Sequence, residues 1–475
     1  MDAADNEATE FIIHDTMVLT MDGARNAYES GYLWVRDGLV AGVGDATGLE
    51  ALPRGIPRRS AAGGLLMPGL VNTHGHLSNG ILRGIYDEMP LAVWFERGMW
   101  PVLEALDEEA GAAGARLALL EQMLAGVTTT LSAEFGTPNP RLADGVLQAI
   151  SESGMRAIVS RMTVDSAVEG LASQAVPRKY RERPVDACRE VERLQQDWCS
   201  ERIAIAAEAL GVLRCSAEMI EAMHDLAMRS RMLFTMHVAS SREEHQECLQ
   251  RHGRGCIAQL AEYGVLGEGT LLAHVIWLSP EEVRQLAAAG AAVSHNPVAN
   301  AYYASGHGDL GALLDAGIRV GLGLDGASTN NSQNPWETMK AAILDQKQHA
   351  GDAAFGSAEL ALELATRGGA RALGMEVQVG SLEPGKKADF IVIDASRPAL
   401  APRQTLVSNL VYSHDPGAVR DVYIGGERVV RDGVHQRLAH DEVLAGANEA
   451  MARVLERTGL DGYLATRGGW RWHRG

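Results

Sequence analysis

Four histidines and one aspartate have types and positions that suit a metal site. His74 and His76 are separated by one residue, and side chains alternate with period two along a strand, so both imidazoles face the same side. His237, His274 and Asp325 each follow an apolar segment farther along the chain. Imidazoles with one carboxylate suit zinc or iron(II) better than magnesium or calcium, which prefer oxygen ligands. The set indicates metal-assisted hydrolysis in which Asp325 also takes a proton from the activated water.

Each of these residues also has a simpler interpretation. An isolated His-x-His pair occurs on many surfaces and in many cores, and GLDG around Asp325 is typical of a turn with a capping aspartate. The metal hypothesis is preferred because the pattern recurs at several strand ends and finishes in a carboxylate.

The middle of the chain alternates strand-like apolar runs with amphipathic helical segments, as expected for parallel βα units. Eight such strands predict an α/β fold, a (β/α)8 TIM-like barrel, whose functional side chains lie at the C-terminal ends of the strands. The candidate residues end the first, fifth, sixth and eighth strands. The predicted strands span residues 65–77, 126–136, 154–162, 202–210, 231–240, 269–278, 291–300 and 320–328.

Short β-like runs at both ends of the chain predict a second, smaller domain. DG dipeptides, which are hairpin signals, interrupt FIIHDTMVLTMDG and GYLWVRDGLVAGVGD, and similar text returns in ADFIVID and DVYIGGERVVRDG. We expect residues 1–66 and 376–475 to form a composite β-sandwich with a C-terminal helical tail, and residues 67–375 to form the barrel.

Composition and charge narrow the range of partners. Lys and Arg total 43 against 61 Asp and Glu, and the formal charge of -18 should repel nucleic acid and anionic lipid. The start MDAADNEATE lacks the features of a signal peptide, and no apolar run approaches the about 18 residues that cross a bilayer. Five cysteines without a C-x-x-C pair predict reduced thiols. We expect a cytoplasmic enzyme with a small-molecule substrate and no nucleic-acid or membrane partner.

Several longer motifs give the chain a family resemblance that covers nearly its whole length. They are MPGLVNTHGHLSNGILRG at 67–84, AGVTTT at 125–130, LLAHVIWLSPEE at 271–282, SHNPVAN at 294–300, GLGLDGASTNN at 321–331 and GSLEPGKKADFIVID at 380–394. With these motifs the chain resembles the amidohydrolase superfamily, in the branch of guanine deaminase, S-adenosylhomocysteine deaminase, atrazine chlorohydrolase and other triazine hydrolases.

The resemblance implies a role for each candidate residue. His74, His76, His237 and Asp325 look like ligands of one divalent transition metal per subunit, expected to be zinc, with iron as the alternative. His274 looks like the histidine that contacts the water or a polar atom of the substrate, and Asp325 like the general base. The fourth strand, RIAIAAEAL, offers no lysine that could bridge two metals, so the sequence also indicates a mononuclear site. Barrels of this branch commonly pair, so a homo-oligomer, a dimer or larger, is expected.

Two departures from the branch bear on the substrate. The deaminases carry H-x-x-E on the fifth strand, where the Glu moves protons to a ring nitrogen, but here the segment is HVAS, with Ser240 in the Glu place. Leu210 stands where many nucleoside deaminases have a substrate-binding histidine. Removing a ring amine requires protonation of a ring nitrogen, whereas an amide-like bond needs only a polarised carbonyl and a proton for the leaving amine. The main expectation is therefore hydrolysis of a non-peptide C–N bond in an N-substituted urea, carbamate or amide.

Two other functions stay open. A deaminase or dechlorinase of an N-heteroaromatic ring, such as a triazine or purine-like base, needs a relocated acid, and Glu208, Glu243, Glu244 and His245 are the candidates. Solvated positions on a helix face are the simpler interpretation of the last three. A non-catalytic barrel scaffold is the alternative from another class, because a fold alone does not prove activity. The retained metal-ligand set argues against a scaffold.

The substrate pocket is expected to draw on the loops that follow the strands. Residues 78–101 form a segment long enough to act as a lid that excludes water, although its aromatic side chains can equally pack into the barrel wall. Asn330 and Asn331 are expected to help position Asp325. The tail tryptophans Trp470 and Trp472 are expected either to seal a subunit interface or to pack on their own subunit. The predicted substrate-binding residues are Arg83, Trp94, Glu208, Ser240, Asn300 and Tyr302.

Overall fold

A barrel of eight strands dominates the computed structural model, which describes residues 9–88, 93–166, 176–460 and 462. The strands are ordered β13-β12-β11-β10-β9-β8-β7-β5, and each hydrogen-bonded pair is parallel. All eight predicted strands are therefore present. Their bounds are β5 (Leu70–Asn72), β7 (Val127–Phe135), β8 (Arg156–Thr163), β9 (Ile203–Ala209), β10 (Phe234–Val238), β11 (Thr270–His274), β12 (Ala292–His295) and β13 (Arg319–Leu322).

Backbone hydrogen bonds between the first and the last strands close the barrel. The N–H of Thr73 donates to the carbonyl of Leu322 at 3.0 Å, and the N–H of Asp325 donates to the carbonyl of His74 at 2.9 Å. Two short parallel strands, β6 (Gly75–His76) and β14 (Asp325–Gly326), extend this seam. The expected (β/α)8 architecture is confirmed, and its seam runs through the candidate metal site.

Strand β7 illustrates why these segments form a parallel sheet. Its sequence VTTTLSAEF is rich in β-branched residues, and all nine residues are buried. A strand with helices on one side and the barrel interior on the other has both faces covered, so it does not show the alternation of a half-exposed strand.

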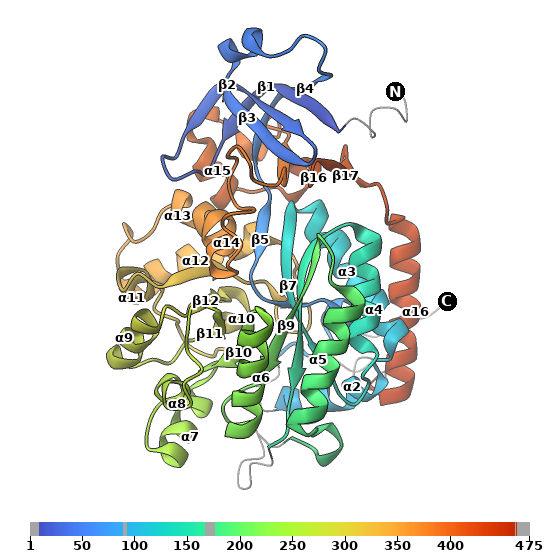
Figure 1. Ribbon diagram of the computed structural model, residues 1–475, viewed down its shortest axis with the longest axis vertical. Coiled ribbons are helices and arrows are strands. Elements are labelled where there is room, and N and C mark those ends of the chain that lie inside the picture. The colour runs from blue at the N-terminus through green and yellow to red at the C-terminus, as the bar shows by residue number, and fades with distance from the viewer. Residues whose placement is uncertain (1–8, 89–92, 167–175, 461, 463–475) are drawn as a thin grey trace.

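Helices surround the barrel and cover its outer face (Figure 1). Local signals fix their ends: Ser279 and Glu282 form a reciprocal capping box at the start of α9, and Pro280 occupies its first turn. The helices are α2 (Trp100–Ala105), α3 (Glu108–Leu124), α4 (Leu142–Ser153), α5 (Pro184–Trp198), α6 (Ala217–Ser230), α7 (Arg242–His252), α8 (Cys256–Glu262), α9 (Pro280–Ala289), α10 (Pro297–Tyr302), α11 (Leu310–Asp315), α12 (Pro335–Ala350), α13 (Ala358–Glu363), α14 (Gly369–Ala372), α15 (Leu406–Tyr412) and α16 (His440–Thr458).

Both ends of the chain build a second eight-stranded sheet, in the order β18-β17-β16-β15-β4-β1-β2-β3. The sheet lies at the upper end of the molecule in Figure 1, whereas α16 runs back along the barrel beside α3. A composite β unit is therefore present, and the exact boundaries 1–66 and 376–475 remain a prediction. The strands are β1 (Glu10–Leu19), β2 (Ala27–Arg36), β3 (Leu39–Asp45), β4 (Arg58–Pro68), β15 (Phe390–Ile393), β16 (Val419–Ile424), β17 (Glu427–Arg431) and β18 (Val434–His435).

A buried ion pair joins the barrel to this sheet. Arg156 at the start of β8 contacts Asp389 just before β15 through Nε to Oδ2 at 2.7 Å and Nη2 to Oδ1 at 3.1 Å. Both side chains are almost completely buried, and the N–H of Gly425 adds a third hydrogen bond to Asp389 at 2.6 Å. A bidentate contact with its remaining acceptor capacity filled has the geometry that a buried charge pair requires.

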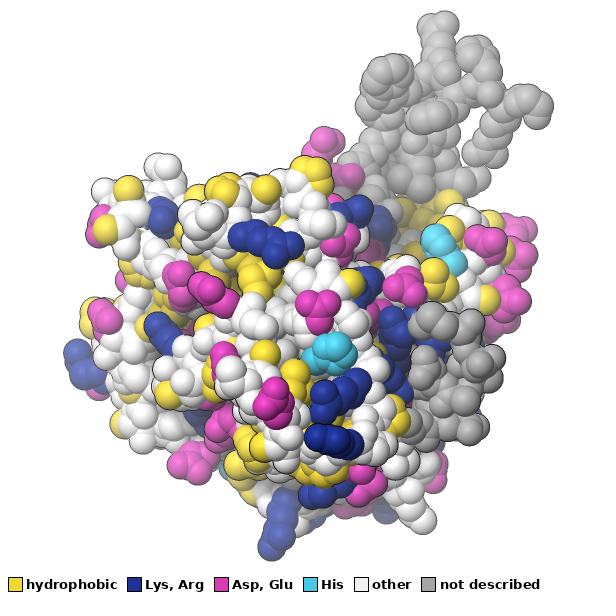
Figure 2. Space-filling view, turned by 90° about the horizontal axis from the view of Figure 1, so that it is seen from above, with side chains coloured by type: hydrophobic (Ala, Val, Ile, Leu, Met, Phe, Trp, Pro, Cys, Tyr) yellow, Lys and Arg dark blue, Asp and Glu magenta, His cyan; other side chains and the backbone are white. Residues whose placement is uncertain are grey.

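The face at the end with the small sheet carries charged groups of both signs. Figure 2, which views the molecule from the end that carries the small sheet, shows basic and acidic side chains interspersed among hydrophobic and other groups. None of the helices in the described part of the chain combines the length and apolar character that a bilayer span requires.

Candidate active site

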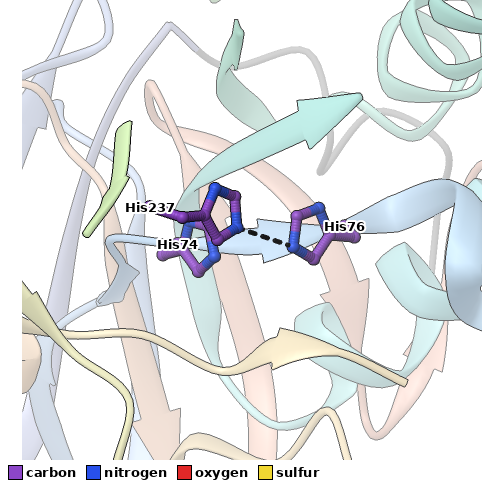
Figure 3. A group of neighbouring side chains, drawn as sticks. All are labelled: His74, His76 and His237. Atoms are coloured by element: carbon purple, nitrogen blue, oxygen red, sulfur yellow. Dashed lines mark hydrogen bonds between the residues drawn. The ribbon is translucent and has the colours of Figure 1, made fainter. Parts of the chain in front are cut away.

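The five predicted side chains meet at the C-terminal ends of the barrel strands. The Nε2 atoms of His76, His274 and His74 lie 3.2, 3.7 and 3.8 Å from the carboxylate oxygens of Asp325. His237 completes the group, with its Nε2 atom 3.4 Å from that of His76 (Figure 3). The five residues that the sequence analysis grouped together are therefore also close together in the structure.

Three of the imidazoles have an oxygen atom behind their Nδ1 atom. A carbonyl or carboxylate oxygen only accepts hydrogen bonds, so each of these Nδ1 atoms is expected to carry the proton and each Nε2 to carry the lone pair. The His237 contact is an ion-pair distance, and neither its Nδ1 nor the facing oxygen has a hydrogen-bond partner among the described residues. The pairs are His76 with Ala133 O at 2.6 Å, His237 with Glu208 Oε1 at 3.0 Å, and His274 with Asn300 Oδ1 at 2.9 Å.

This arrangement fits a bound cation. The dashed line in Figure 3 joins the Nε2 atoms of His76 and His237. Because the proton of each neutral imidazole is on Nδ1, neither Nε2 can donate to the other, and Asp325 adds negative charge beside them. Both ring nitrogens of His74 are buried and lack a hydrogen-bond partner in the described part of the chain. One ligand atom from each of His74, His76 and His237 lies within 4.8 Å of the others, as does one from each of His74, His274 and Asp325. Nitrogen-rich sets of this kind suit zinc.

The close packing of the four imidazoles and Asp325 shifts the pKa values of these groups. Burial alone would raise the pKa of Asp325, but the imidazoles around it hold that pKa well below its usual range. Burial opposes protonation of His76, yet the hydrogen bond and charge of Asp325 outweigh it and raise the pKa of His76 to about 9. Burial and the neighbouring imidazoles keep the pKa of His74 and of His237 well below the ordinary value. The lone pairs of this cluster can therefore bind either a proton, which His76 would carry, or a metal ion.

The backbone that presents these side chains is unusual. His274 and Asp325 both adopt the left-handed region, with φ of 72° and 60°. Residues other than glycine seldom adopt this conformation, and such strain clusters at functional sites. Asn72 supports the seam, since its Oδ1 accepts from the N–H of Leu324 at 2.8 Å and from that of His74 at 3.3 Å.

Glu208 lies behind the site and not in the substrate pocket. Its side chain has no exposed surface, and one oxygen accepts from Ser160 Oγ at 2.5 Å while the other faces His237. Burial raises the pKa of Glu208 to about 7. Glu208 is not among the residues that line the cavity, and it contacts His237 instead, so its contact with substrate stays a prediction.

One cavity opens beside the five side chains and encloses about 650 Å³, part of it at the open mouth. Three of the predicted substrate-binding residues, Trp94, Ser240 and Asn300, line it. Trp94 belongs to the π-helical turn η4 (Trp94–Met99) of the predicted lid segment, of which residues 89–92 lie outside the described part. The walls are mainly apolar and include Trp94, Phe95, Met99, Phe135, Met162 and Leu210.

Two other predicted substrate contacts lie elsewhere. Arg83 is absent from the cavity lining, and its partly exposed guanidinium pairs with Glu121. The hydroxyl of Tyr302 donates to Asp87, and the neighbouring Tyr303 lines the cavity instead. Neither residue lines the cavity, so their contact with substrate stays a prediction. Residues adjacent in sequence on a loop or helix point in different directions, which strand alternation cannot anticipate. The tail with Trp470 and Trp472 lies outside the described residues.

The two asparagines after Asp325 have separate tasks. Asn330 Nδ2 donates to the carbonyl of Leu324 at 2.7 Å and so secures the backbone next to Asp325. Asn331 Oδ1 accepts from the N–H of Gly84 at 2.8 Å and therefore ties the segment after β6 to the loop after β14. Asn330 thus contacts the backbone beside Asp325, whereas a role of Asn331 in positioning Asp325 stays a prediction.

The candidate replacements for the missing glutamate are clearly separated by the structure. Glu244 is buried, at 2% exposure, and its Oε2 accepts hydrogen bonds from the N–H and the hydroxyl of Ser240, each at 2.8 Å. Glu243 is exposed, and neither it nor His245 lines the cavity. Among these residues, Glu244 alone places a carboxylate in contact with the side chain that has taken the glutamate position.

Arg214 is a site residue that sequence reasoning missed. It lines the cavity beside His237 and Ser240, and its guanidinium carbon lies 4.2 Å from the centre of the Phe95 ring. The rule that barrel function sits in the loops after the strands would have indicated it, because it follows β9 by a few residues. The amino-acid composition gave no indication that an arginine would line an apolar pocket.

The fold and the site together define a metal-dependent hydrolase built on a (β/α)8 barrel, and three comparisons with known proteins agree. A 5-methylthioadenosine/S-adenosylhomocysteine deaminase of Symbiobacterium thermophilum is 32% identical over 446 residues, covering 94% of this chain and 99% of that protein. The zinc-containing structure of an adenosine deaminase from Xanthomonas campestris superposes with a TM-score of 0.85 at 26% identity, covering 94% and 99% of the two chains. An atrazine chlorohydrolase from Arthrobacter aurescens complexed with zinc shares the fold, with a TM-score of 0.84 at 21% identity and coverage of 93% and 100%.

Residues 65–429 match the amidohydrolase family, and the chain belongs to it. It is accordingly an enzyme that acts on carbon–nitrogen bonds other than peptide bonds. The non-catalytic scaffold is thereby set aside.

Proposed function

We propose that the protein is an aminohydrolase that replaces the amino group of an N-heteroaromatic ring, of the purine or triazine type, by oxygen. The relatives named as deaminases favour this alternative over the urea, carbamate or amide substrate expected from Ser240 alone. The observation that carries the proposal is the partly buried hydrogen bond from Ser240 to Glu244, because it supplies the carboxyl group whose absence had argued against ring chemistry.

His74, His76, His237 and Asp325 would hold the ion, expected to be zinc, and His274 would face the water or the substrate. When bound, the ion supplies Lewis-acid activation of water. The oxygen-backed Nδ1 atoms keep the lone pairs of the imidazoles directed inward.

Asp325 is the general base, and its low pKa keeps the carboxylate ionised. As water oxygen bonds to the ring carbon, Asp325 takes one proton from the water. In this cycle Glu244 starts protonated: the Ser240 hydroxyl gives its proton to a ring nitrogen and takes one from the carboxyl group of Glu244, which becomes a carboxylate. The proton on Asp325 then passes to the amino group, the C–N bond breaks and ammonia leaves. The remaining hydroxyl proton returns through Ser240 to Glu244, which leaves a ring carbonyl and restores both side chains.

The apolar walls exclude bulk water and offer aromatic surface to a flat ring. Trp94 and Phe95 pack edge to face with ring centres 4.8 Å apart, and Tyr303 lies 6.0 Å from Trp94. Such a pocket suits a planar heterocycle, and water exclusion strengthens the polar contacts made inside it.

The test measures ammonia or amine release by the zinc-loaded enzyme from adenosine, 5′-deoxyadenosine, guanine and aminotriazines, beside aryl ureas, carbamates and amides. Ser240→Ala and Glu244→Gln should each lower kcat for ring deamination by about 10²-fold or more, the lower range for general acid catalysis. The exposed neighbour provides a matched control, since Glu243→Gln should behave as the wild type. Turnover of ureas or carbamates without turnover of any ring amine would overturn the proposal and restore the first expectation.

A further inference from the structure

Arg214 is a buried cation that the proposed reaction does not use. Only 5% of its surface is exposed, and it lines the same cavity as His237 and Ser240. A side chain at Gly211 would meet the carbonyl oxygen of His237 at 3.4 Å, Arg214 Nη1 at 3.8 Å and Glu244 Oε1 at 4.0 Å. These three groups therefore surround one point at the edge of the metal site.

The guanidinium has no ion-pair partner within the described ranges. Its charge is felt by Glu244 and Glu247, yet neither carboxylate approaches its nitrogens within 4.0 Å. The Oε2 atom of Glu244 is already occupied by Ser240. The face of the guanidinium is covered by Phe95, so its N–H groups, which lie in the guanidinium plane, remain to bind another molecule.

Other polar atoms of the cavity wall are also donors without acceptors. Trp94 Nε1 and Asn300 Nδ2 are buried and have no hydrogen-bond partner in the described part of the chain. Asn300 Oδ1 is engaged by His274, which leaves the amide nitrogen free. Both atoms have almost no accessible surface, so they lie within the cavity wall, whereas the guanidinium of Arg214 belongs to the lining itself.

We propose that Arg214 is a specificity-determining residue that binds a carboxylate carried by the substrate on, or a few bonds from, its aminated ring. The inference rests on the proposed ring aminohydrolase activity and adds the substrate class, an aminated N-heteroaromatic carboxylic acid. A planar carboxylate matches the planar guanidinium fork, which can bind it through two parallel hydrogen bonds.

Charge favours a carboxylate over a phosphate at this position. One guanidinium balances one negative charge, and the described cavity lining contains Arg214 as its single arginine or lysine. The net charge of -18 would repel an anion at long range, but screening limits that repulsion beyond about 8 Å at physiological ionic strength. Inside the cavity, the nearby guanidinium of Arg214 therefore has more influence on an anionic ligand than the net charge of the protein.

The experiment compares three acids with their primary amides: 4-aminopyrimidine-5-carboxylic acid, adenosine 5′-carboxylic acid and pterin-6-carboxylic acid. Ammonia release gives kcat/KM, and calorimetry of the deaminated product acids and amides gives binding that is independent of turnover. Wild-type enzyme should prefer at least one acid over its amide by about tenfold or more, the value expected for a charge-assisted hydrogen bond. Arg214→Met should abolish that preference, and Arg214→Lys should retain part of it.

Arg242 provides the matched control, because it is exposed at the start of α7 and does not line the cavity. Arg242→Met should leave the acid preference unchanged, and thermal unfolding of both methionine variants shows whether they are folded. The inference is overturned if no acid is preferred, if the preference survives in Arg214→Met, or if adenosine 5′-monophosphate alone is preferred over adenosine. Failure of the wild type to deaminate any ring amine would instead refute the proposed function, while the calorimetry would still test Arg214.

Discussion

His237 Nδ1 and Glu208 Oε1 face each other at 3.0 Å, and both atoms are buried with no other hydrogen-bond partner among the described residues. Glu208 comes from the end of β9 and His237 from β10, so the contact crosses two neighbouring strands. A carboxylate behind a ligating imidazole fixes its tautomer and makes the opposite nitrogen a stronger ligand. The relationship gives Glu208 a role that does not require contact with substrate.

Glu208→Gln should therefore weaken zinc binding while leaving the fold intact. The amide keeps the size of the side chain but removes its charge, and the loss of affinity should be about 10- to 100-fold, as for other groups that support metal ligands. Competition with a chromophoric chelator measures the dissociation constant. Glu243→Gln serves as the exposed control, and an affinity equal to that of the wild type in Glu208→Gln would show that the contact has no influence on the metal.

Ser240→Glu should rescue the Glu244→Gln variant for ring deamination. The substitution restores a carboxyl group at the cavity wall, and the glutamine removes the competing charge behind it. We expect ammonia release from a ring amine to recover by at least about tenfold over Glu244→Gln, within the range of general acid catalysis. No recovery in a folded, zinc-loaded double variant would argue that Ser240 and Glu244 do not conduct the proton.

Trp94→Ala should lower kcat/KM without loss of metal. Trp94 lines the cavity and does not belong to the candidate metal-ligand groups. Stacking of a base on an aromatic side chain is worth about 1–3 kcal/mol, which corresponds to about 5- to 150-fold. Steady-state kinetics and zinc content per chain are the measurements. Trp94→Phe should retain more activity, and unchanged kinetics in the alanine variant would place the indole in a purely structural role.

Asp389→Asn should destabilise the protein by about 3–5 kcal/mol, because it leaves the guanidinium of Arg156 buried beside a neutral group. Urea unfolding followed by circular dichroism and by tryptophan fluorescence measures the change and shows whether the two sheets still unfold together. The double variant Arg156→Met, Asp389→Leu should be less destabilised than Asp389→Asn. A double variant that loses as much as the two single substitutions combined would mean that the pair is not coupled.

The barrel and its metal site are predictable from sequence because both rest on periodicity. Buried strands leave long β-branched runs, and the His-x-His spacing fixes which face of a strand His74 and His76 occupy. The C-terminal ends of parallel barrel strands share one edge, and the five candidate side chains all follow strand segments, so the sequence predicts that they gather there.

The cavity wall was less predictable, since it is built by loops and helix turns. Arg83 and Tyr302 pair with carboxylates outside the cavity, and Arg214 faces inward from the loop after β9. The pairing of Ser240 with Glu244 spans one helical turn, and only the cap of α7 determines which of two adjacent glutamates turns inward. Such directions depend on local φ and ψ values that a single sequence does not specify.

Strand β4 pairs in parallel with β1 and antiparallel with β15, so the small sheet is interrupted in sequence by the whole barrel. During synthesis, β1 to β4 emerge long before β15 exists, and one edge of β4 has no strand beside it for that entire interval. Exposed strand edges recruit other chains. Ribosome-bound chains that end before Phe390 should consequently bind chaperones through this edge. Once β15 is synthesised, it pairs with β4 and the edge is no longer exposed.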